Sequence, residues 1–557
     1  MTVGRAILVL VLLVLIGLPI AIAPREKRTN RETGATARDA DDAHRIVVFT
    51  PHNEQIRQEF ADAFGRWHET KFGEHVEVSW RQPGGTSEIR KMLESAYLAQ
   101  LKRTPSKGVG DNETLGGNAD LLFGGGSYEF IQMAKELSVE TPSGKRSTTV
   151  LAPLDLDQEF LDATYGAGSG GAPPTIGDVP LYDAKRMWFG TALSGFGIVY
   201  NPSILERLGV PAPQHWADLC DPRLRGWVVL VNPSQSGSVT TAFEAIMQRR
   251  GWQVGWQILR RMAANARSFA ASAPRAPTDV SLGDAAAGVC IDFYGRFQAQ
   301  AMEDATRDAT HQASVPRVGY VDPAGETVID PDPIALLRGA PNPVLARRFV
   351  EFVLSREGQA LWQFHAKSRL ATRPADNLGP ETYEVRRMPV RRELYVRDFD
   401  RFVDQVDPFA LATAVEKPDR NFRAFLPSMF VAMAIDNREL LRAAWNAIVE
   451  HPAYPRDGRI VLAGDVSDST LRAMLERFDA LPSVDGPDGT TFDLSDPAAL
   501  GPVREGWLKS GWSSARLWPT DAIPAEVLRS RMTAFFRAQY EGINDLAHSG
   551  LTTGAAP

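Results

Sequence analysis

Serine, threonine and glycine residues stand just before two segments with helical spacing of apolar residues, and they could bind an anion. N–H groups at a helix N-terminus and the positive end of the helix dipole favour phosphate or carboxylate, and hydroxyl groups add donors. Ordinary helix capping is the alternative. Two such helix ends that faced each other across a cleft would form an anion clamp. The candidates are Gly85, Thr86 and Ser87 before the first segment and Ser236, Gly237 and Ser238 before the second.

Three polar residues alternate at strand spacing further along the chain. Asp292, Tyr294 and Arg296 could therefore face one side of a strand and offer an acceptor, a stacking donor and a cation. Arg296 suits a carboxylate, phosphate or phosphonate, because its guanidinium can donate two parallel hydrogen bonds. The alternative is that Arg296 only solvates the end of a strand.

Patterns typical of other kinds of site are incomplete in this sequence. The histidines at 68 and 75 are seven residues apart, whereas a zinc-binding helix needs a spacing of four. The sequence has neither a Gly-x-Ser-x-Gly elbow nor a His-Glu-x-x-His helix, so we expect no enzyme, no metal centre and no cofactor. Cys220 and Cys290 are too few for a disulfide framework, although a single bridge between them remains open.

Strands and helices alternate in the first part of the main body. Short apolar segments at 46–49, 76–80 and 119–123 read as strands, and helical spacing follows the first two. This alternation predicts an α/β region with an open, parallel sheet, which binds ligands at the carboxyl ends of its strands. His52 could equally cap the helix that begins at Asn53. The candidates at these strand ends are His52, Gly125 and Ser127.

Composition describes a folded protein of several units. The chain has 557 residues, of which 44% are hydrophobic and 23% are charged, so collagen, a disordered tail and a polytopic membrane protein are excluded. A length of this size allows about three or four units. The formal net charge is -7 and no run of like charge could follow a phosphate backbone, so we expect no nucleic-acid partner.

The N-terminus has the pattern of an export signal or an anchor. Residues 6–23 carry no charge and follow Arg5. Eighteen helical residues span roughly 27 Å, which is close to the hydrocarbon thickness of a membrane. Residues 1–23 are therefore a signal peptide or a retained membrane anchor, and polar residues 24–44 form a flexible linker. Either way, we expect the main body to work outside the cytoplasm, in the periplasm or another extracytoplasmic space.

An ordered series of motifs between residues 46 and 367 resembles the extracellular solute-binding proteins of ABC importers. The subgroup is the one that contains ferric-iron and phosphonate binders. The motifs are WFGTALSGFGIVYN (188–201), WADL (216–219), PRLRG (222–226), NPSQSGS (232–238), DFY (292–294), IALLRGAPNP (334–343) and SREGQ (355–359).

The resemblance implies a type II periplasmic-binding fold with two α/β lobes that close over a solute. Lobe 1 would comprise residues 45–195 and be completed by 318–370, and lobe 2 would comprise 196–317. Ser194 and Gly195 would lie near the hinge and the ligand, where glycine lets the backbone bend. We expect a monomer that captures a small anionic solute, such as a phosphonate, phosphate ester or carboxylate, and delivers it to an ABC permease.

Iron is the alternative solute. Iron-binding members of the family present two adjacent tyrosines and a histidine, and this chain has Phe293 in place of the first tyrosine. Loss of a phenolate weakens a ferric site, because a hard ferric ion prefers several oxygen donors. Tyr294 and His52 would be metal ligands only if iron binds.

The C-terminal residues 371–557 read as a mostly helical extension without an assigned role. Asp436 and Glu439 form a capping-box pattern, and Pro524 begins a helical pattern with Gly542 near its end. We interpret the apolar stripes as core. A second alternative for the whole protein is a membrane-anchored ligand sensor that signals through these helices. Three tryptophans in loop-like sequence are expected to be buried anchors: Trp507, Trp512 and Trp518.

Overall fold

A computed structural model describes residues 44–103, 118–142, 144–310, 317–414, 419, 421–456, 460–486, 489–508 and 524–553. The chain divides into two units, Met1–His44 and Arg45–Pro557, and every element below lies in the second. The expected signal or anchor and nearly all of the expected linker lie outside the described residues. None of the helices in the described part of the chain combines the length and apolar composition that a membrane crossing needs.

The first sheet has seven strands in the order β16-β9-β15-β3-β1-β2, and β6 pairs with β15 beside that path. β1 runs parallel to β2 and β3, as the alternation of strands and helices predicts, whereas β15 runs antiparallel to β3, β6 and β9. We call this sheet and its helices lobe 1. Its strands are β1 (Arg45–Phe49), β2 (Glu77–Arg81), β3 (Leu121–Phe123), β6 (Leu151–Ala152), β9 (Phe189–Ser194), β15 (Asp330–Leu337) and β16 (Met388–Pro389).

Apolar spacing explains the helices of lobe 1. In α3, Asn53 caps the N-terminus by accepting from the N–H of Ile56, and Ile56, Phe60 and Phe64 are buried at intervals of four. The rings of Phe60 and Trp362 pack at 4.4 Å between centroids, which ties α3 to α13. The helices are α3 (Glu54–Phe72), α4 (Thr86–Lys102), α5 (Ser127–Met133), α6 (Gln158–Tyr165), α12 (Pro343–Leu354) and α13 (Arg356–Gln363).

The second sheet has five strands in the order β12-β11-β13-β10-β14, and we call it with its helices lobe 2. β11 runs parallel to β12 and β13, and β10 is antiparallel to β13 and β14. The strands are β10 (Phe196–Tyr200), β11 (Val228–Val231), β12 (Ala266–Ala270), β13 (Ala287–Ile291) and β14 (Gly319–Val321). The helices are α7 (Pro202–Leu208), α8 (Gly237–Arg250), α9 (Trp252–Ala264), α10 (Arg275–Leu282) and α11 (Asp292–Thr310).

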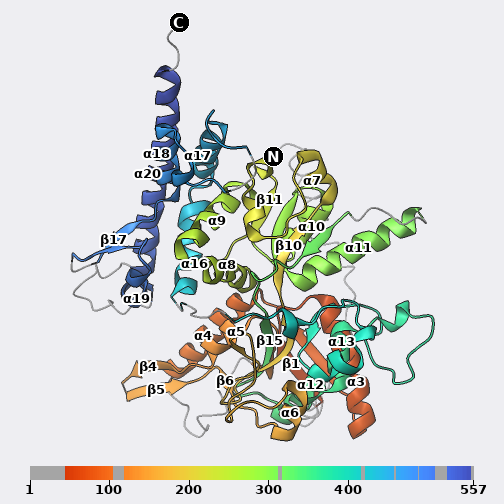
Figure 1. Cartoon of the computed structure of the whole chain (residues 1–557). Helices are drawn as coiled ribbons and strands as arrows, with labels where there is room; N and C mark the ends of the chain where they lie inside the picture. Colours follow the sequence, from red (N-terminus) through yellow and green to blue (C-terminus); the bar gives the residue numbers. More distant parts are fainter. Residues whose placement is uncertain are drawn as a thin grey trace, which may run out of the picture. The chain divides into compact units, whose positions relative to one another are not determined.

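The chain crosses from lobe 1 into lobe 2 and later returns to lobe 1 (Figure 1). Gly195 alone separates β9 in the first sheet from β10 in the second, and the return runs from β14 to β15. β14 belongs to the second sheet, although residues 318–370 were expected to complete lobe 1. β16 belongs to the first sheet, although residues 371–557 were expected to form the extension. The domain boundaries themselves remain a prediction.

The C-terminal region shares a continuous core with lobe 2. In Figure 1, α16 lies beside α8 and α9. The indole N–H of Trp445 donates to Asn265 Oδ1 at 2.9 Å, and the buried Arg261 pairs with Asp479 at 2.6 Å. The larger helices are α14 (Arg392–Arg397), α16 (Phe422–Phe430), α17 (Arg438–Glu450), α18 (Ser469–Asp479) and α20 (Pro524–Thr553), and the short ones are α15 (Pro408–Leu411) and α19 (Leu500–Val503).

Two details of this region differ from the sequence prediction. α17 begins after Asn437, and Asp436 instead accepts a hydrogen bond from the hydroxyl of Thr533 at 3.0 Å, so the expected capping box is wrong. A π-helical turn at Val431–Ile435 shifts the start of α17. α20 continues through Gly542 to Thr553. Trp507 is buried as expected, whereas Trp512 and Trp518 lie outside the described residues.

Three two-stranded hairpins lie outside the two sheets. They are β4 (Leu137–Thr141) with β5 (Gly144–Thr148), β7 (Thr175–Ile176) with β8 (Val179–Pro180), and β17 (Ser483–Asp485) with β18 (Thr491–Asp493).

Candidate functional site

The N-termini of α4 in lobe 1 and α8 in lobe 2 meet between the lobes. A Cβ atom added to Gly237 would lie 3.3 Å from Ser87 Oγ and 3.3 Å from Glu129 Oε1. A Cβ atom added to Gly85 would lie 3.5 Å from the carbonyl oxygen of Gln235. The two groups predicted from sequence therefore come together. We call the residues in these contacts, Gly85, Ser87, Glu129, Gln235 and Gly237, the helix-end junction. The first N–H groups of both helices have no acceptor within their own helix.

The side chains at the two helix ends cap as well as line this junction. Ser236 is the N-cap of α8 and accepts from the N–H of Val239 at 3.5 Å, and Ser236 and Ser238 hydroxyls are 3.1 Å apart. At α4, the N–H of Gly85 donates to the carboxylate of Glu88 at 3.1 Å. The capping alternative is therefore real for Ser236, and it does not exclude contact with a ligand.

A carboxylate of the protein already lies at the helix-end junction. Glu129, in the first turn of α5, is only 4% exposed. Its Oε1 accepts from the Ser87 hydroxyl at 2.7 Å, and its Oε2 pairs with Arg90. The junction thus holds negative charge through hydroxyl and guanidinium donors, which is the chemistry that an oxyanion needs.

The glycine-rich turn after β3 packs against the two neighbouring turns. Gly124 and Gly125 have φ of +102° and +121°, and an added Cβ would collide with the ring of His52 and with Thr86, respectively. The three polar turns at the strand ends therefore converge, as the open-sheet prediction requires. The hydrogen-bond donors of the glycine-rich turn are used within the protein. Gly125 N donates to Asp332, and Ser127 donates to Asp330 from N at 3.1 Å and from Oγ at 2.6 Å.

A buried arginine directly before β16 of lobe 1 contacts several of these residues. Arg387 is 4% exposed, pairs with Asp332 and donates to the Ser194 hydroxyl at 3.0 Å. Its guanidinium lies 4.3 Å from the ring centre of Phe293 in lobe 2. We call Arg387, Asp332, Ser194 and His52 the Arg387 cluster, because His52 Nε2 is 2.9 Å from Arg387 and 2.7 Å from Asp332.

Burial and pairing set the charges of the Arg387 cluster. Burial lowers the pKa of His52 and outweighs the attraction of Asp332, so the imidazole is neutral near pH 7. Burial alone would raise the pKa of Asp332, but Arg387 and His52 hold that pKa below its usual value. The cluster therefore consists of a neutral imidazole and one ion pair. Two buried nitrogens in it have no hydrogen-bond partner among the described residues: His52 Nδ1 and Arg387 Nε.

The strand interpretation of Asp292, Tyr294 and Arg296 is wrong, because these residues form the first turns of α11. Helical geometry turns Tyr294 away from Asp292 and Arg296, which are four residues apart and share a face. Burial raises the pKa of Tyr294 to about 12, and the nearby Arg387 opposes that rise. Tyr294 thus belongs to the surroundings of the Arg387 cluster.

Asp292 and Arg296 make their contacts within the protein, close to the connection between β9 and β10. Asp292 is fully buried and accepts from the N–H of Gly195 at 2.9 Å and from Phe293 N at 2.7 Å. Burial raises the pKa of Asp292 to about 7. Arg296 pairs with Asp322, so its expected role as the cation for a solute is not supported by these contacts. Cys220 and Cys290 are both free and buried.

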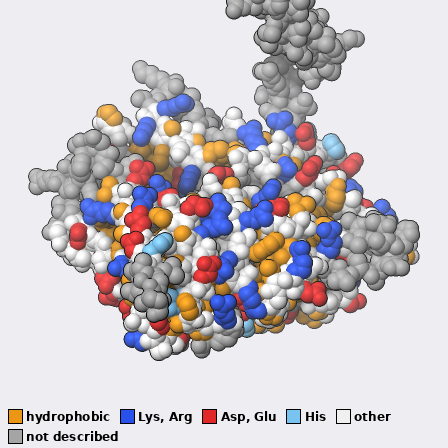
Figure 2. Space-filling view, turned by 90° about the horizontal axis from the view of Figure 1, so that it is seen from above, with side chains coloured by type: hydrophobic (Ala, Val, Ile, Leu, Met, Phe, Trp, Pro, Cys, Tyr) orange, Lys and Arg blue, Asp and Glu red, His pale blue; other side chains and the backbone are white. Residues whose placement is uncertain are grey.

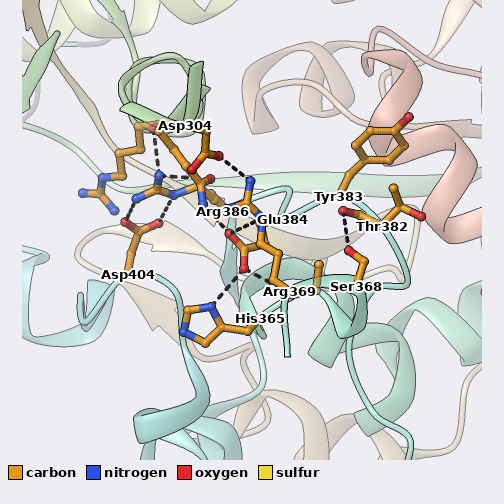
Figure 3. Close-up of polar contacts among 12 residues, drawn as sticks. Asp304, His365, Ser368, Arg369, Thr382, Tyr383, Glu384, Arg386 and Asp404 are labelled. Carbon is orange, nitrogen blue, oxygen red and sulfur yellow. Dashed lines mark hydrogen bonds and ion pairs between the residues drawn. The ribbon is translucent and has the colours of Figure 1, made fainter. Parts of the chain in front are cut away.

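A second polar network joins α11 of lobe 2 to the segment that follows α13 (Figure 3). Asp304 pairs with Arg369, and Gln300 donates to Glu384. Glu384 also accepts from His365 Nδ1 at 2.9 Å. These contacts fix the segment 365–386 against α11 and support the position from which Arg387 enters the cluster.

Sequence reasoning missed five residues that act here. Glu129 and the two aspartates of β15 were not considered, although Asp330 and Asp332 alternate at strand spacing in the return segment. Arg387 and Arg423 lie beyond the part of the chain that the resemblance covers, and a separation of 335 positions between His52 and Arg387 leaves no local pattern.

The surface has mixed charge, and no metal cluster is formed in the described residues. Figure 2 shows Lys and Arg side chains interspersed with Asp and Glu on the visible face. Within the described ranges, no group of three or more His, Cys, Asp or Glu side chains could hold a metal ion.

Residues 172–385 match the family model described as "Bacterial extracellular solute-binding protein". This confirms the resemblance predicted from sequence over those residues. The two sheets with their helices and the added C-terminal helices described above agree with the expected α/β fold class.

Curated relatives match a similar length of chain. The "Phosphoglycerate transport regulatory protein PgtC" of Salmonella typhimurium is 24% identical over 206 residues, which is 37% of this chain and 48% of the relative. An uncharacterised protein of Haemophilus influenzae is 28% identical over 210 residues, which is 37% of this chain and 55% of that protein. The chain thus matches about half the length of these relatives.

Solved structures are similar at lower identity. The periplasmic binding protein AfuA of Actinobacillus pleuropneumoniae, with fructose-6-phosphate bound, has a TM-score of 0.43 and 17% identity, covering 72% of this chain and 97% of AfuA. Iron-bound HitA of Pseudomonas aeruginosa has a TM-score of 0.40 and 18% identity, covering 62% of this chain and 92% of HitA.

Proposed function

We propose, on the premise of the family match over residues 172–385, that this chain captures a small oxyanion between its two lobes. The protein would work outside the cytoplasmic membrane and pass the solute to an ABC permease. Binding and release need no covalent chemistry. Ligand contacts made to both lobes at once would favour the closed state over the open one.

The observation that carries this proposal is the helix-end junction. Gly237 of α8 lies against Ser87 and Glu129 of lobe 1, so two helix N-termini from different lobes point into one place. Their N–H groups and dipoles act on the same bound group, and both favour negative charge. Glu129 supports the same chemistry, because it is a carboxylate held by the Ser87 hydroxyl and by Arg90.

A phosphoryl group fits this junction better than a ferric ion does. Hydroxyl and amide donors suit a phosphoryl oxygen, whereas iron requires several anionic oxygen ligands. His52 and Tyr294 are both near Arg387, whose fixed positive charge opposes binding of a cation. The name of the relative PgtC, a phosphoglycerate transport regulatory protein, points to the same class of solute.

Titration calorimetry of the purified protein tests the proposal. The probes are 3-phosphoglycerate, glycerol 3-phosphate, methylphosphonate, inorganic phosphate and ferric citrate. The double variant Ser236→Ala, Ser238→Ala should weaken binding of the preferred phosphoryl probe about ten- to a hundredfold, because two donors to a charged group are lost. Ser355→Ala is the matched control, since Ser355 caps α13 in lobe 1 by accepting from Gly358 N at 3.2 Å.

The results separate the candidates. Failure of every phosphoryl and phosphonate probe to bind would refute the proposal, and binding of ferric citrate alone would favour the iron alternative. Equal losses in the double variant and in Ser355→Ala would show that capping, and not ligand contact, accounts for the effect.

A ligand sensor is the second candidate function. It is favoured by the continuous core between lobe 2 and the C-terminal region, because a movement of lobe 2 must carry α17 and α18 with it. The word "regulatory" in the name of PgtC agrees with this candidate. A membrane partner that binds the C-terminal region only when solute is present would support the sensor.

A further inference from the structure

Arg423, the second residue of α16, extends from the C-terminal region to the N-terminal half of α8. The side chain is 9% exposed. Its Nη1 donates to Thr241 Oγ1 at 3.0 Å and to Glu244 Oε2 at 2.8 Å, and its Nη2 donates to the carbonyl oxygen of Gly237 at 3.4 Å. Arg423 therefore contacts the glycine that forms the lobe 2 side of the helix-end junction.

The same guanidinium also contacts lobe 1. It lies 4.0 Å from the ring centre of Tyr128, which stands between Ser127 and Glu129 at the start of α5. Arg423 and Glu129 are close enough for Glu129 to favour the charged form of the guanidinium. One side chain of the C-terminal region thus contacts both lobes at the place where their helix ends meet.

Glu244 and Glu129 compensate the positive charge of Arg423, but not every donor of its guanidinium is used. A cation near the N-terminus of a helix is repelled by the helix dipole, and a buried guanidinium requires compensation. Glu244 provides one ion pair, but Arg423 Nε is buried and finds no hydrogen-bond partner in the part of the chain that the structure describes. An unpaired buried donor costs free energy that a ligand oxygen would recover.

α16 holds Arg423 at a fixed place relative to lobe 2. The ring of Phe430 lies 5.1 Å from that of Phe243 in α8, and the ring of Phe422 lies 5.1 Å from that of Trp252 in α9. Because these four rings pack at both ends of α16, Arg423 moves with lobe 2. Its contact with Tyr128 then depends on how far lobe 2 has closed onto lobe 1.

We propose that Arg423 is a solute-binding residue supplied by the C-terminal region, and that its Nε donates to the oxyanion held at the helix-end junction. The inference rests on the proposed function and extends it. The family match ends at residue 385, so this contact belongs to the added region. A guanidinium favours a doubly charged phosphoryl group over a neutral hydroxyl group, so Arg423 would also contribute to specificity.

The test uses the full chain with 3-phosphoglycerate and with glycerate, which lacks the phosphoryl group. Arg423→Gln should weaken binding of 3-phosphoglycerate at least tenfold and change binding of glycerate much less. Arg423→Lys keeps the charge and the neighbour Glu244 but removes Nε, and should weaken 3-phosphoglycerate binding severalfold. The control is Arg249→Gln, because Arg249 joins the other end of α8 to Thr413 through Thr413 Oγ1 at 2.7 Å.

The outcomes distinguish this inference from the proposed function. If the unmodified protein binds no phosphoryl probe, the proposed function fails, and this inference fails with it. If the unmodified protein binds 3-phosphoglycerate and both Arg423 variants bind it as tightly as the unmodified protein does, only the role of Arg423 is refuted. An equal loss for 3-phosphoglycerate and glycerate would also refute it, because a purely structural role does not discriminate between them. Should Arg423→Gln fail to fold, the Arg423→Lys result decides.

Discussion

Replacement of Glu129 by glutamine tests whether the helix-end junction binds an anion. Glutamine keeps the size of the side chain and an oxygen that can accept from the Ser87 hydroxyl, which now lies 2.7 Å from Glu129 Oε1. It removes one negative charge and weakens the hold on Arg90 Nε, while Arg90 stays paired with Glu94. An anionic solute should therefore bind more tightly to Glu129→Gln.

The size of the effect follows from the distance between the charges. Glu129 Oε1 is 3.3 Å from the position of a Cβ atom on Gly237, so a ligand between the helix ends would lie about 5 Å from the carboxylate. Two like charges at that distance repel by about 2 to 3 kcal/mol at an effective dielectric constant of about 20 to 40. Removal of one of them should tighten binding roughly tenfold to a hundredfold.

Titration calorimetry with 3-phosphoglycerate at low and moderate salt measures this change. Glu94→Gln is the matched control, since Glu94 pairs with the same Arg90 at 2.9 Å but lies two turns into α4. Its effect should be smaller. Unchanged or weaker binding in Glu129→Gln would refute the reasoning about the anion, and weaker binding of ferric citrate in the same variant would indicate a cation site.

Gly237→Ala should weaken 3-phosphoglycerate binding about tenfold, because the new methyl group would lie 3.3 Å from oxygens of lobe 1. It should not lower Tm, because alanine suits a helix. Gly85→Ala is the control in the same calorimetry, because its methyl group would lie at an ordinary contact distance of 3.5 Å from the carbonyl oxygen of Gln235. Burial raises the pKa of Asp292 to about 7, so the folded state retains a proton that the unfolded chain loses and stability falls as pH rises from about 4 to 7. Asp292→Asn, which can still accept from Gly195, should thus raise Tm more at pH 8 than at pH 5, and an equal change at both would contradict this. Arg387→Met leaves a buried carboxylate unpaired and should lower the unfolding free energy by about 3–5 kcal/mol in urea titrations; a loss below about 1 kcal/mol would show that the pair contributes little.

The fold was largely predictable because its signals are local. The apolar segments at 46–49 and 119–123 and the spacing of Ile56, Phe60 and Phe64 each identify one element without knowledge of the rest. Strands of two or three residues carry no such pattern, so the sheet to which β14 and β16 belong could not be read. The strand prediction for Asp292, Tyr294 and Arg296 failed because three alternating polar residues also fit the first turns of a helix.

The candidate site was predictable only in part. Helix starts with serine, threonine and glycine identified both sides of the helix-end junction, because the helix dipole and free N–H groups follow from local sequence. Arg387 and Arg423 could not be found in this way, since tertiary packing brings Arg387 to His52 across 335 positions and Arg423 to Thr241 across 182 positions. Charges from distant segments are placed by the fold, and sequence spacing does not reveal them.

The hydrogen bonds within the site indicate which predicted residues remain available to a solute. The donors of Gly125 and Ser127 are used by the two aspartates of β15, and these aspartates also repel an anion from that turn. The helix-end junction also contains a carboxylate, Glu129, but Arg90 pairs with it and the Ser87 hydroxyl donates to it, while two helix N-termini and Arg423 add positive potential. A small oxyanion is therefore expected against α4 and α8.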